Sequence, residues 1–203
     1  MVSFKEFISK RLNEDIDPNF KKIALVPGSY TPPHKGHLEM IKFYAKRNQE
    51  VVIIISNSKN RVNALGRELS AETRKKIWEI YLKAAKLKNV SIVISDKQSP
   101  ITAAYDLATQ KYNKGYQIIF GQSDKDDDNR WKGMYPYCKR FMRGPGASVM
   151  LPPENTKAPV AFDGLSSEEL RKNIKKPTVI KKFIPEEITN KATIEKLIKM
   201  MKG

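Results

Sequence analysis

Short apolar runs alternate with longer segments of mixed polarity through most of the chain. The runs are four or five residues long and rich in β-branched side chains, as expected of strands covered on both faces. They are Ile23–Val26, Val51–Ile55, Val90–Ile94, Gln117–Phe120 and Ser148–Leu151. The segments between them have the apolar spacing of helices: His37–Arg47, Ala71–Lys88, Ile101–Asn113 and Asn129–Phe141. Strands alternating with helices imply βαβ crossovers, so we predict an α/β fold with a Rossmann-like parallel sheet of about five strands.

The two ends of the chain differ from this central pattern. Residues 1–17 place apolar side chains at helical spacing before Pro18, which predicts an amphipathic helix. Such a helix packs on the domain or makes a subunit contact, with a docking or targeting peptide as the alternative. Residues 20–175 form the predicted central domain, and residues 176–203 a basic helical tail whose apolar stripe indicates docking: Ile194, Leu197, Ile198 and Met201.

Charge and cysteine content narrow the possible partners and location. The 203 residues include 38 Lys and Arg against 22 Asp and Glu, a net charge of +16, of which +7 lies between Arg171 and Gly203. An anionic partner is expected: nucleic acid, a phosphorylated small molecule or an anionic membrane surface. Cys138 is the single cysteine, which excludes an intramolecular disulfide and fits a reducing compartment. With no apolar stretch of about 20 residues and a polar start, we expect a cytoplasmic protein.

The loop after the first predicted strand carries the clearest chemistry. Gly28 allows close approach of the backbone to a bulky ligand, and two prolines stiffen the loop. His34 and His37 bracket Gly36 where the next helix starts, so both imidazoles and the free helix amides face one spot, which is typical of a phosphate site. A metal pair and a merely satisfied surface pair are the alternatives. No third His, Cys cluster or adjacent carboxylate completes a zinc shell.

The segment Gly28-Ser-Tyr-Thr-Pro-Pro-His-Lys-Gly-His37 resembles the signature Gly-x-Phe-x-Pro-x-His-x-Gly-His of the nucleotidylyltransferase superfamily. It lies between strand and helix, as that family requires. Tyr30 replaces the usual Phe, and Thr31 stands where many members have Asp. The resemblance implies that His34 and His37 are catalytic and that Thr31 contacts the substrate. It also implies a set of nucleotide-binding residues: Gly28, Ser29, Tyr30, Lys35 and Gly36.

Further matches extend the resemblance over 22–173. Segments 56–59 and 69–74 resemble the family's loop and helix start, which implies that Lys59 and Arg74 face phosphates or substrate; an ordinary helix start is the alternative for the second. Gly121-Gln-Ser-Asp124 resembles the Gly-x-Asp turn beside the base and ribose. Trp131 stacks on a substrate ring or packs in the core. The acidic run 124–128 suggests magnesium or, as we favour, a solvated loop.

The late segment Ser166-Ser-Glu-Glu-Leu-Arg171 resembles the Ser-Ser-Thr-x-x-Arg motif that holds the triphosphate. Glu168 replaces its Thr, while Ser166, Ser167 and Arg171 match. Residues 163–170 also resemble a cytidylyltransferase element, but Ala161 replaces the Arg that starts it. The balance favours ATP over CTP.

The resemblance implies transfer of AMP from ATP to a phosphorylated small molecule, with release of pyrophosphate. His34 and His37 would donate to phosphate oxygens, Arg171 with the Ser166 and Ser167 amides would hold the β- and γ-phosphates, and Mg²⁺ would be bound mainly through the nucleotide. Nicotinamide mononucleotide and phosphopantetheine are the candidate acceptors. A cytidylyltransferase and a non-catalytic nucleic-acid-binding protein are the alternatives, although no nucleic-acid motif is found. A homo-oligomer is compatible with the sequence, no membrane partner is expected, and the start of the chain resembles leader segments of proteins from large tailed phages.

Overall fold

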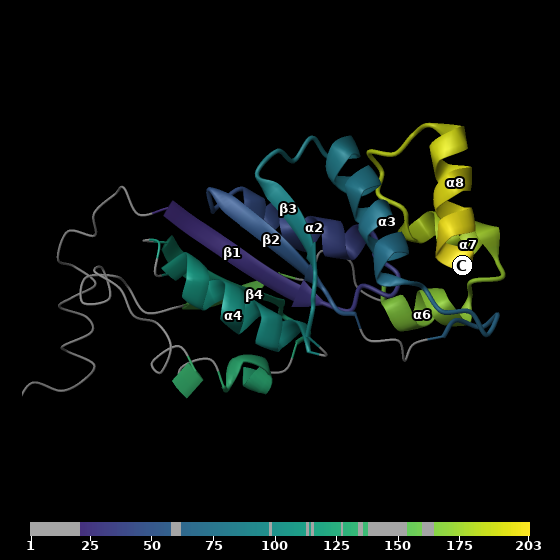
Figure 1. Cartoon of the computed structure of the whole chain (residues 1–203). Helices are drawn as coiled ribbons and strands as arrows, with labels where there is room; N and C mark the ends of the chain where they lie inside the picture. The colour runs from purple at the N-terminus through teal and green to yellow at the C-terminus, as the bar shows by residue number, and fades with distance from the viewer. Residues whose placement is uncertain are drawn as a thin grey trace, which may run out of the picture.

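A computed structural model describes residues 21–57, 62–97, 99–112, 114, 116–126, 128–133, 136–137, 154–159 and 165–203. It contains one five-stranded sheet in the order β3-β2-β1-β4-β5, in which every neighbouring pair is parallel (Figure 1). The strands are β1 (Lys21–Gly28), β2 (Glu50–Ile55), β3 (Val90–Ile94), β4 (Tyr116–Ser123) and β5 (Glu154–Ala158). The predicted α/β, Rossmann-like architecture is confirmed.

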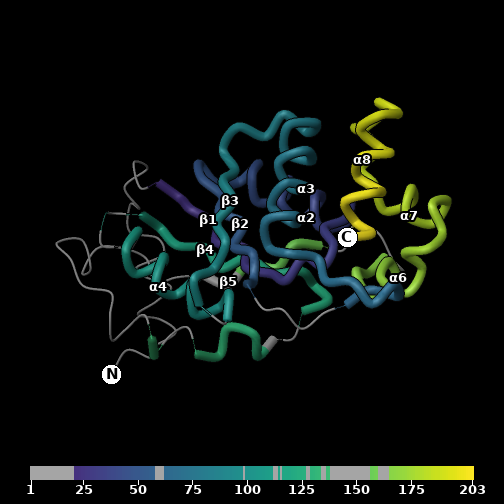
Figure 2. The backbone as a smooth tube through the Cα atoms, turned by 45° about the vertical axis from the view of Figure 1, so that its right-hand side comes forward, coloured from purple at the N-terminus to yellow at the C-terminus, as the bar shows by residue number. Residues whose placement is uncertain are grey.

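Helices cover both faces of the sheet (Figures 1 and 2). Helices α2 (Lys35–Ala45) and α3 (Ala71–Ala84) pack on one face, against Ala24, Val51 and their neighbours. Helix α4 (Pro100–Tyr112) packs on the other, against Ile23 and Val52. Because successive strand residues point to opposite faces, the continuous apolar runs supply both cores.

The predicted burial of β3 on both faces is wrong. Strand β3 forms one edge of the sheet, and its residues are alternately half-buried and exposed. The Val93 side chain is 44% exposed. Helix α4 packs over β1, β2 and β4 rather than over this edge, so one face of β3 stays open.

Two elements after β4 also differ from the prediction. The fifth strand of the sheet is Glu154–Ala158, which pairs with β4 from Ile119 to Ser123; the predicted strand 148–151 lies outside the described residues. The predicted helix 129–141 is, in its described part, a short 3₁₀ turn η1 (Asp128–Trp131), a turn at Lys132 and Gly133, and helical backbone at Pro136 and Tyr137. Gly133 disfavours a helix interior, which explains the interruption, whereas a proline is tolerated in the first turn of a helix.

The last part of the chain forms three helices beside α3, as Figure 2 shows: α6 (Ser167–Lys172), α7 (Pro177–Phe183) and α8 (Lys191–Lys202). Helix α6 begins after Ser166, whose hydroxyl caps the helix by accepting from the Glu169 amide at 3.1 Å. The apolar side of the tail joins the core of α2 and α3 through Ile180, Phe183, Leu197 and Met201. The predicted docked tail is therefore confirmed, whereas the predicted helix at 1–17 lies outside the described residues.

Of the helices in the described ranges, none has both the length and the hydropathy needed to cross a bilayer.

Candidate active site

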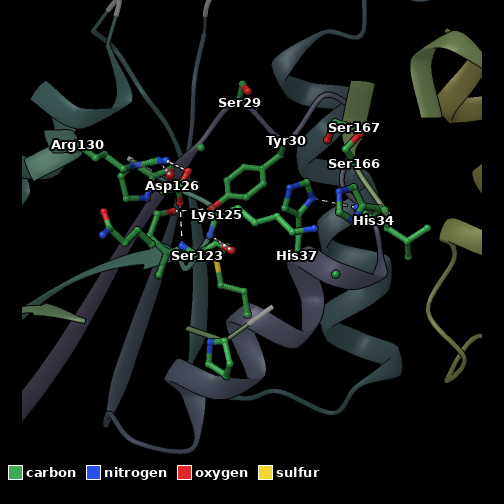
Figure 3. A pocket seen from close by; sticks show the side chains of 18 residues that line it. Ser29, Tyr30, His34, His37, Ser123, Lys125, Asp126, Arg130, Ser166 and Ser167 are labelled. Atoms are coloured by element: carbon green, nitrogen blue, oxygen red, sulfur yellow. Dashed lines mark hydrogen bonds and ion pairs between the residues drawn. The ribbon is translucent and has the colours of Figure 1, made fainter. Parts of the chain in front are cut away.

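A cavity of about 280 Å³ opens at the carboxyl ends of β1 and β4 (Figure 3). The strand order reverses between these two strands, and ligands of open parallel sheets bind at such a switch point. Five segments supply the walls: the end of β1 with its loop, the start of α2, the end of β4 with the segment after it, Pro159 directly after β5, and the start of α6. Their polar or glycine residues are Gly28, Ser29, Tyr30, His34, Gly36, His37, Gln122, Ser123, Lys125, Asp126, Arg130, Ser166 and Ser167.

The two histidines form a stacked pair at the N-terminus of α2. Their ring centroids are 3.7 Å apart and the rings are inclined by 28°. The backbone N–H of His34 donates to Nδ1 of His37 at 3.2 Å, so the proton of a neutral His37 lies on Nε2. Nδ1 of His34 is buried and has no hydrogen-bond partner in the described structure. The pair thus offers N–H donors and no positive charge of its own.

The surroundings keep both imidazoles neutral. Burial, together with the nearby Lys125 ammonium, lowers the pKa of His34 to about 4. Burial also places the pKa of His37 well below the ordinary value, with His34 contributing. At neutral pH the two side chains are therefore uncharged, and they can offer N–H donors but no positive charge.

The buried histidines predict a pH dependence of stability. His34 has a folded-state pKa of about 4 against 6.5 when exposed, so the folded state binds fewer protons between these values. Stability is full above pH 6.5 and falls as the pH drops toward 4, by about 3 kcal/mol from His34 alone. We expect urea unfolding from pH 7.5 to 4.5 to show a steeper loss for the native chain than for His34→Gln. Equal slopes would contradict the buried, neutral state of His34.

Tyr30 supports the loop under the histidines. Its hydroxyl donates to the carbonyl oxygen of Val26 at 2.8 Å, and its ring meets His37 and Trp78 edge-on at 5.1 and 5.2 Å. A Cβ at Gly28 would lie 2.6 Å from the Tyr30 ring. This ring is thus a neighbour that requires glycine at position 28, and Gly28 also lines the cavity.

The segment after β4 is held at the cavity by two charged side chains, Asp126 and Arg130, which we call the Arg130 clamp. Asp126 accepts from the Ser123 amide at 2.8 Å and from Nη1 of Arg130 at 2.7 Å. Nη2 of Arg130 also donates to the carbonyl oxygen of Pro27. These bonds, two of which Figure 3 marks, join the ends of β1 and β4. Sequence reasoning missed Gln122, Ser123, Lys125, Asp126 and Arg130 as cavity residues; the signal was a charged run directly after a central strand.

The two residues predicted to lie beside the nucleotide base, Gly121 and Asp124, are not among the residues that line the cavity. Asp124 is exposed, and its amide donates to the carbonyl oxygen of Ala158 at 3.0 Å. Gly121 lies within β4, where an added Cβ would lie 2.9 Å from Tyr44 and Val26. Their neighbours in sequence line the cavity instead: Gln122 and Ser123 at the end of β4, and Lys125 just after it.

Several predicted substrate contacts lie in other surroundings. Arg74 is 2% exposed and donates to the backbone carbonyl of Ser29. Trp131 is 4% exposed and lies 4.5 Å from the ring of Phe120, so it packs in the core under α4, the alternative the sequence left open. Thr31 is buried as well. Lys59 lies outside the described residues.

Two further residues predicted to bind the nucleotide, Lys35 and Arg171, contact groups of the protein itself. Nζ of Lys35 lies 3.6 Å from Oε1 of Glu186, and Nη1 of Arg171 donates to the carbonyl oxygen of Thr31 at 2.6 Å. Ser167 also donates to this loop, at the Pro32 carbonyl oxygen, 3.0 Å away. In the structure, Arg171 and Ser167 fasten α6 to the loop before α2.

Within the described ranges, no three His, Cys, Asp or Glu side chains gather as a metal site. Both carboxylate oxygens of Asp126, which lies in the cavity wall, already accept hydrogen bonds from Ser123 and Arg130. A divalent ion here would therefore have to be held chiefly by oxygens of a bound ligand.

Comparison with known proteins identifies the family to which the chain belongs. The model of the cytidylyltransferase-like family matches residues 25–173. A phosphopantetheine adenylyltransferase of Mycoplasma capricolum subsp. capricolum is 29% identical over 86 residues, a match that spans 42% of this chain and 57% of that relative.

Solved structures show the same fold. A bifunctional NMN adenylyltransferase/ADP ribose pyrophosphatase of Francisella tularensis superposes with a TM-score of 0.61 at 20% identity, over 91% of this chain and 51% of that one. A nicotinic acid mononucleotide adenylyltransferase of Plasmodium falciparum gives 0.52 at 15% identity, over 88% and 95%. The resemblance to the nucleotidylyltransferase superfamily is thereby confirmed, and the chain belongs to the cytidylyltransferase-like family.

Proposed function

We propose that this protein is a nucleotidylyltransferase that transfers AMP from ATP to a phosphorylated small molecule and releases pyrophosphate. The observation that carries the proposal is the stacked, neutral His34–His37 pair at the start of α2, in the cavity at the β1/β4 switch point. A helix N-terminus with N–H donors beside it suits phosphate oxygens. Family membership and the adenylyltransferase names of its relatives support the same reaction class.

The chemistry asks for positioning and charge stabilisation rather than a protein nucleophile. A phosphate oxygen of the acceptor attacks the α-phosphorus in line, and the bond from that phosphorus to the pyrophosphate oxygen breaks. The nucleophile is already an anion, so no base has to remove a proton. Nε2–H of His37 donates to a phosphate oxygen and stabilises the negative charge that grows toward the leaving group.

The start of α6 would receive the rest of the triphosphate. Ser166 and Ser167 line the cavity beside His34 (Figure 3), and their amides are proposed to meet the β- and γ-phosphates. Mg²⁺ bound to these phosphates would neutralise part of their charge. Since Asp126 has both oxygens engaged, the protein would contribute few ligands of its own.

ATP is the proposed donor because two sequence features point to it. Arg171 is present as in the adenylyl motif, while Ala161 replaces the Arg of the cytidylyl element. CTP is the alternative donor. The acceptor is proposed to be a phosphorylated small molecule of the nicotinamide mononucleotide or phosphopantetheine type.

The test is a panel assay of pyrophosphate release. Each of the four nucleoside triphosphates is incubated with Mg²⁺ and each candidate acceptor, with an acceptor-free reaction as the control for simple hydrolysis, and products are identified by mass spectrometry. We expect acceptor-dependent pyrophosphate release with ATP and a product heavier than the acceptor by one AMP group. Absence of nucleotide binding by calorimetry, together with tight, salt-sensitive binding to polynucleotide, would instead favour the nucleic-acid-binding alternative.

A further inference from the structure

We propose that Lys125 is a catalytic residue of this site, the cation that binds the phosphates of the nucleotide across from the two histidines. This inference rests on the proposed nucleotidylyl transfer and names the residue that supplies its positive charge. The run 124–128 reads in the sequence as a solvated loop, and the motifs direct attention to Lys35, Lys59, Arg74 and Arg171 instead.

The geometry places the Lys125 side chain over the cavity. Lys125 lines the same cavity as His34, His37 and Ser166, and Figure 3 shows its side chain extending toward the two imidazoles. The electrostatic effect of its ammonium on His34 agrees with this closeness. Two neutral donors and one ammonium therefore face the space in which a phosphate would lie.

The neighbouring carboxylate is already committed to other groups. Asp126 is bound to Arg130 and to the Ser123 amide, and the structure shows no carboxylate within ion-pair distance of Lys125 among the described residues. Lys35 and Arg171 differ, because Glu186 and the Thr31 carbonyl oxygen engage them. As far as the described residues go, Lys125 can thus give its charge to a ligand without first breaking an ion pair.

The backbone of Lys125 is held on both sides. Its amide lies 3.4 Å from the Ser123 hydroxyl oxygen, and the Asp126 amide donates to the Ser123 carbonyl oxygen at 2.9 Å. The Arg130 clamp then ties Asp126 to the end of β1 through Pro27. A long side chain on an anchored turn can follow the phosphates while its base stays fixed.

A lysine suits this position chemically. Its ammonium is a compact charge with three rotatable donors, so it can contact oxygens on more than one phosphorus. As the bond to pyrophosphate breaks, negative charge moves toward the leaving group, and a cation over the cavity stabilises that state. The histidines, being neutral, cannot supply this charge.

The test compares Lys125→Ala and Lys125→Arg with Lys132→Ala, which removes the same charge from an exposed position in the same segment. ATP binding is measured by calorimetry and turnover by pyrophosphate release. We expect Lys125→Ala to weaken ATP binding about 10- to 100-fold, as for loss of a charged hydrogen bond. Lys125→Arg should retain part of the binding, and Lys132→Ala should match the native protein.

A second measurement does not depend on activity. His34 and His37 are the two histidines of the chain, so their imidazole signals can be followed separately by NMR during a pH titration without ligand. Removing the Lys125 ammonium should raise the pKa of His34, because one positive neighbour is lost, while Lys132→Ala should leave it in place.

The outcomes separate the two proposals. If the native protein binds ATP and Lys125→Ala binds it equally well, the role of Lys125 is overturned and the proposed function stands. If the native protein binds no nucleotide, the proposed function fails, and the role of Lys125 fails with it. An unchanged His34 titration in Lys125→Ala would also contradict the placement of the ammonium beside the pair.

Discussion

Replacing His37 with alanine is expected to slow pyrophosphate release about 10²- to 10³-fold, the usual cost of removing one donor from a site of developing negative charge. The variant loses the Nε2–H donor and also the acceptor for the His34 backbone amide, which lies 3.2 Å from Nδ1. Steady-state kinetics with saturating ATP and acceptor measure the effect. A rate within threefold of the native protein would exclude His37 from the chemistry.

Two conservative variants divide the roles of this imidazole. His37→Asn can place an oxygen near the Nδ1 position and keep the acceptor for the His34 amide, whereas His37→Gln can place an N–H near the Nε2 position. If the main role of His37 is to donate Nε2–H into the cavity, His37→Gln retains more turnover than His37→Asn. The reverse order would assign the main role to loop support, with the thermal stability of each variant as the control.

Replacing Phe183 with alanine is expected to lower the free energy of unfolding by about 3–5 kcal/mol, the range for truncating a buried aromatic side chain. Phe183 is 1% exposed, and its ring meets His34 at 5.9 Å with the planes at 75°. The change therefore opens a void directly against the histidine pair. Urea unfolding at one temperature and pH measures the loss.

The controls for Phe183 lie within α7. Phe183→Leu keeps most of the volume and should cost much less, and Lys182→Ala changes an exposed neighbour and should stay near native stability. A loss below about 1 kcal/mol for Phe183→Ala would mean that the helix does not support the core as described.

The central sheet could be predicted because buried parallel strands carry a local signature. The run Val51–Ile55 is apolar throughout, and it must be, since both of its faces are covered. Strand β5 reads Glu-Asn-Thr-Lys-Ala, which has no such signature. Strand β5 is defined by the pairing of its backbone with β4 at the sheet edge. Because the partner strand is distant in sequence, the amino-acid composition of the β5 segment does not reveal this pairing.

The same distinction applies to the site. His34 and His37 could be predicted as neighbours because three residues at a helix start bring them together locally. Trp131 and Arg74 could not be assigned to core or cavity, because the side of the sheet they reach depends on how η1 and α3 pack. Lys125 was missed because its importance arises from the switch point, where β4 comes to lie beside β1.

The C-terminal segment combines high charge with packing. Residues 171–203 carry a net charge of +7, yet the apolar stripe of the tail predicted docking. Its apolar side chains, Phe183 among them, complete the core of α2 and α3, and Phe183 lies against His34. The lysines occupy the opposite, exposed side of the same helices.

The packing of α6 and α7 against the start of α2 also sets an order of assembly during synthesis. The chain is made from its N-terminus, so the loop with His34 exists long before Ser166, Ser167 and Phe183 are added. The cavity lacks the part of its wall that α6 supplies until Ser166 and Ser167 have been made and docked, and the contact of Phe183 with His34 forms later still. The parts of the site from β1 and α2 are therefore made before the part from α6, and the site is complete only after the helices that follow β5 have docked.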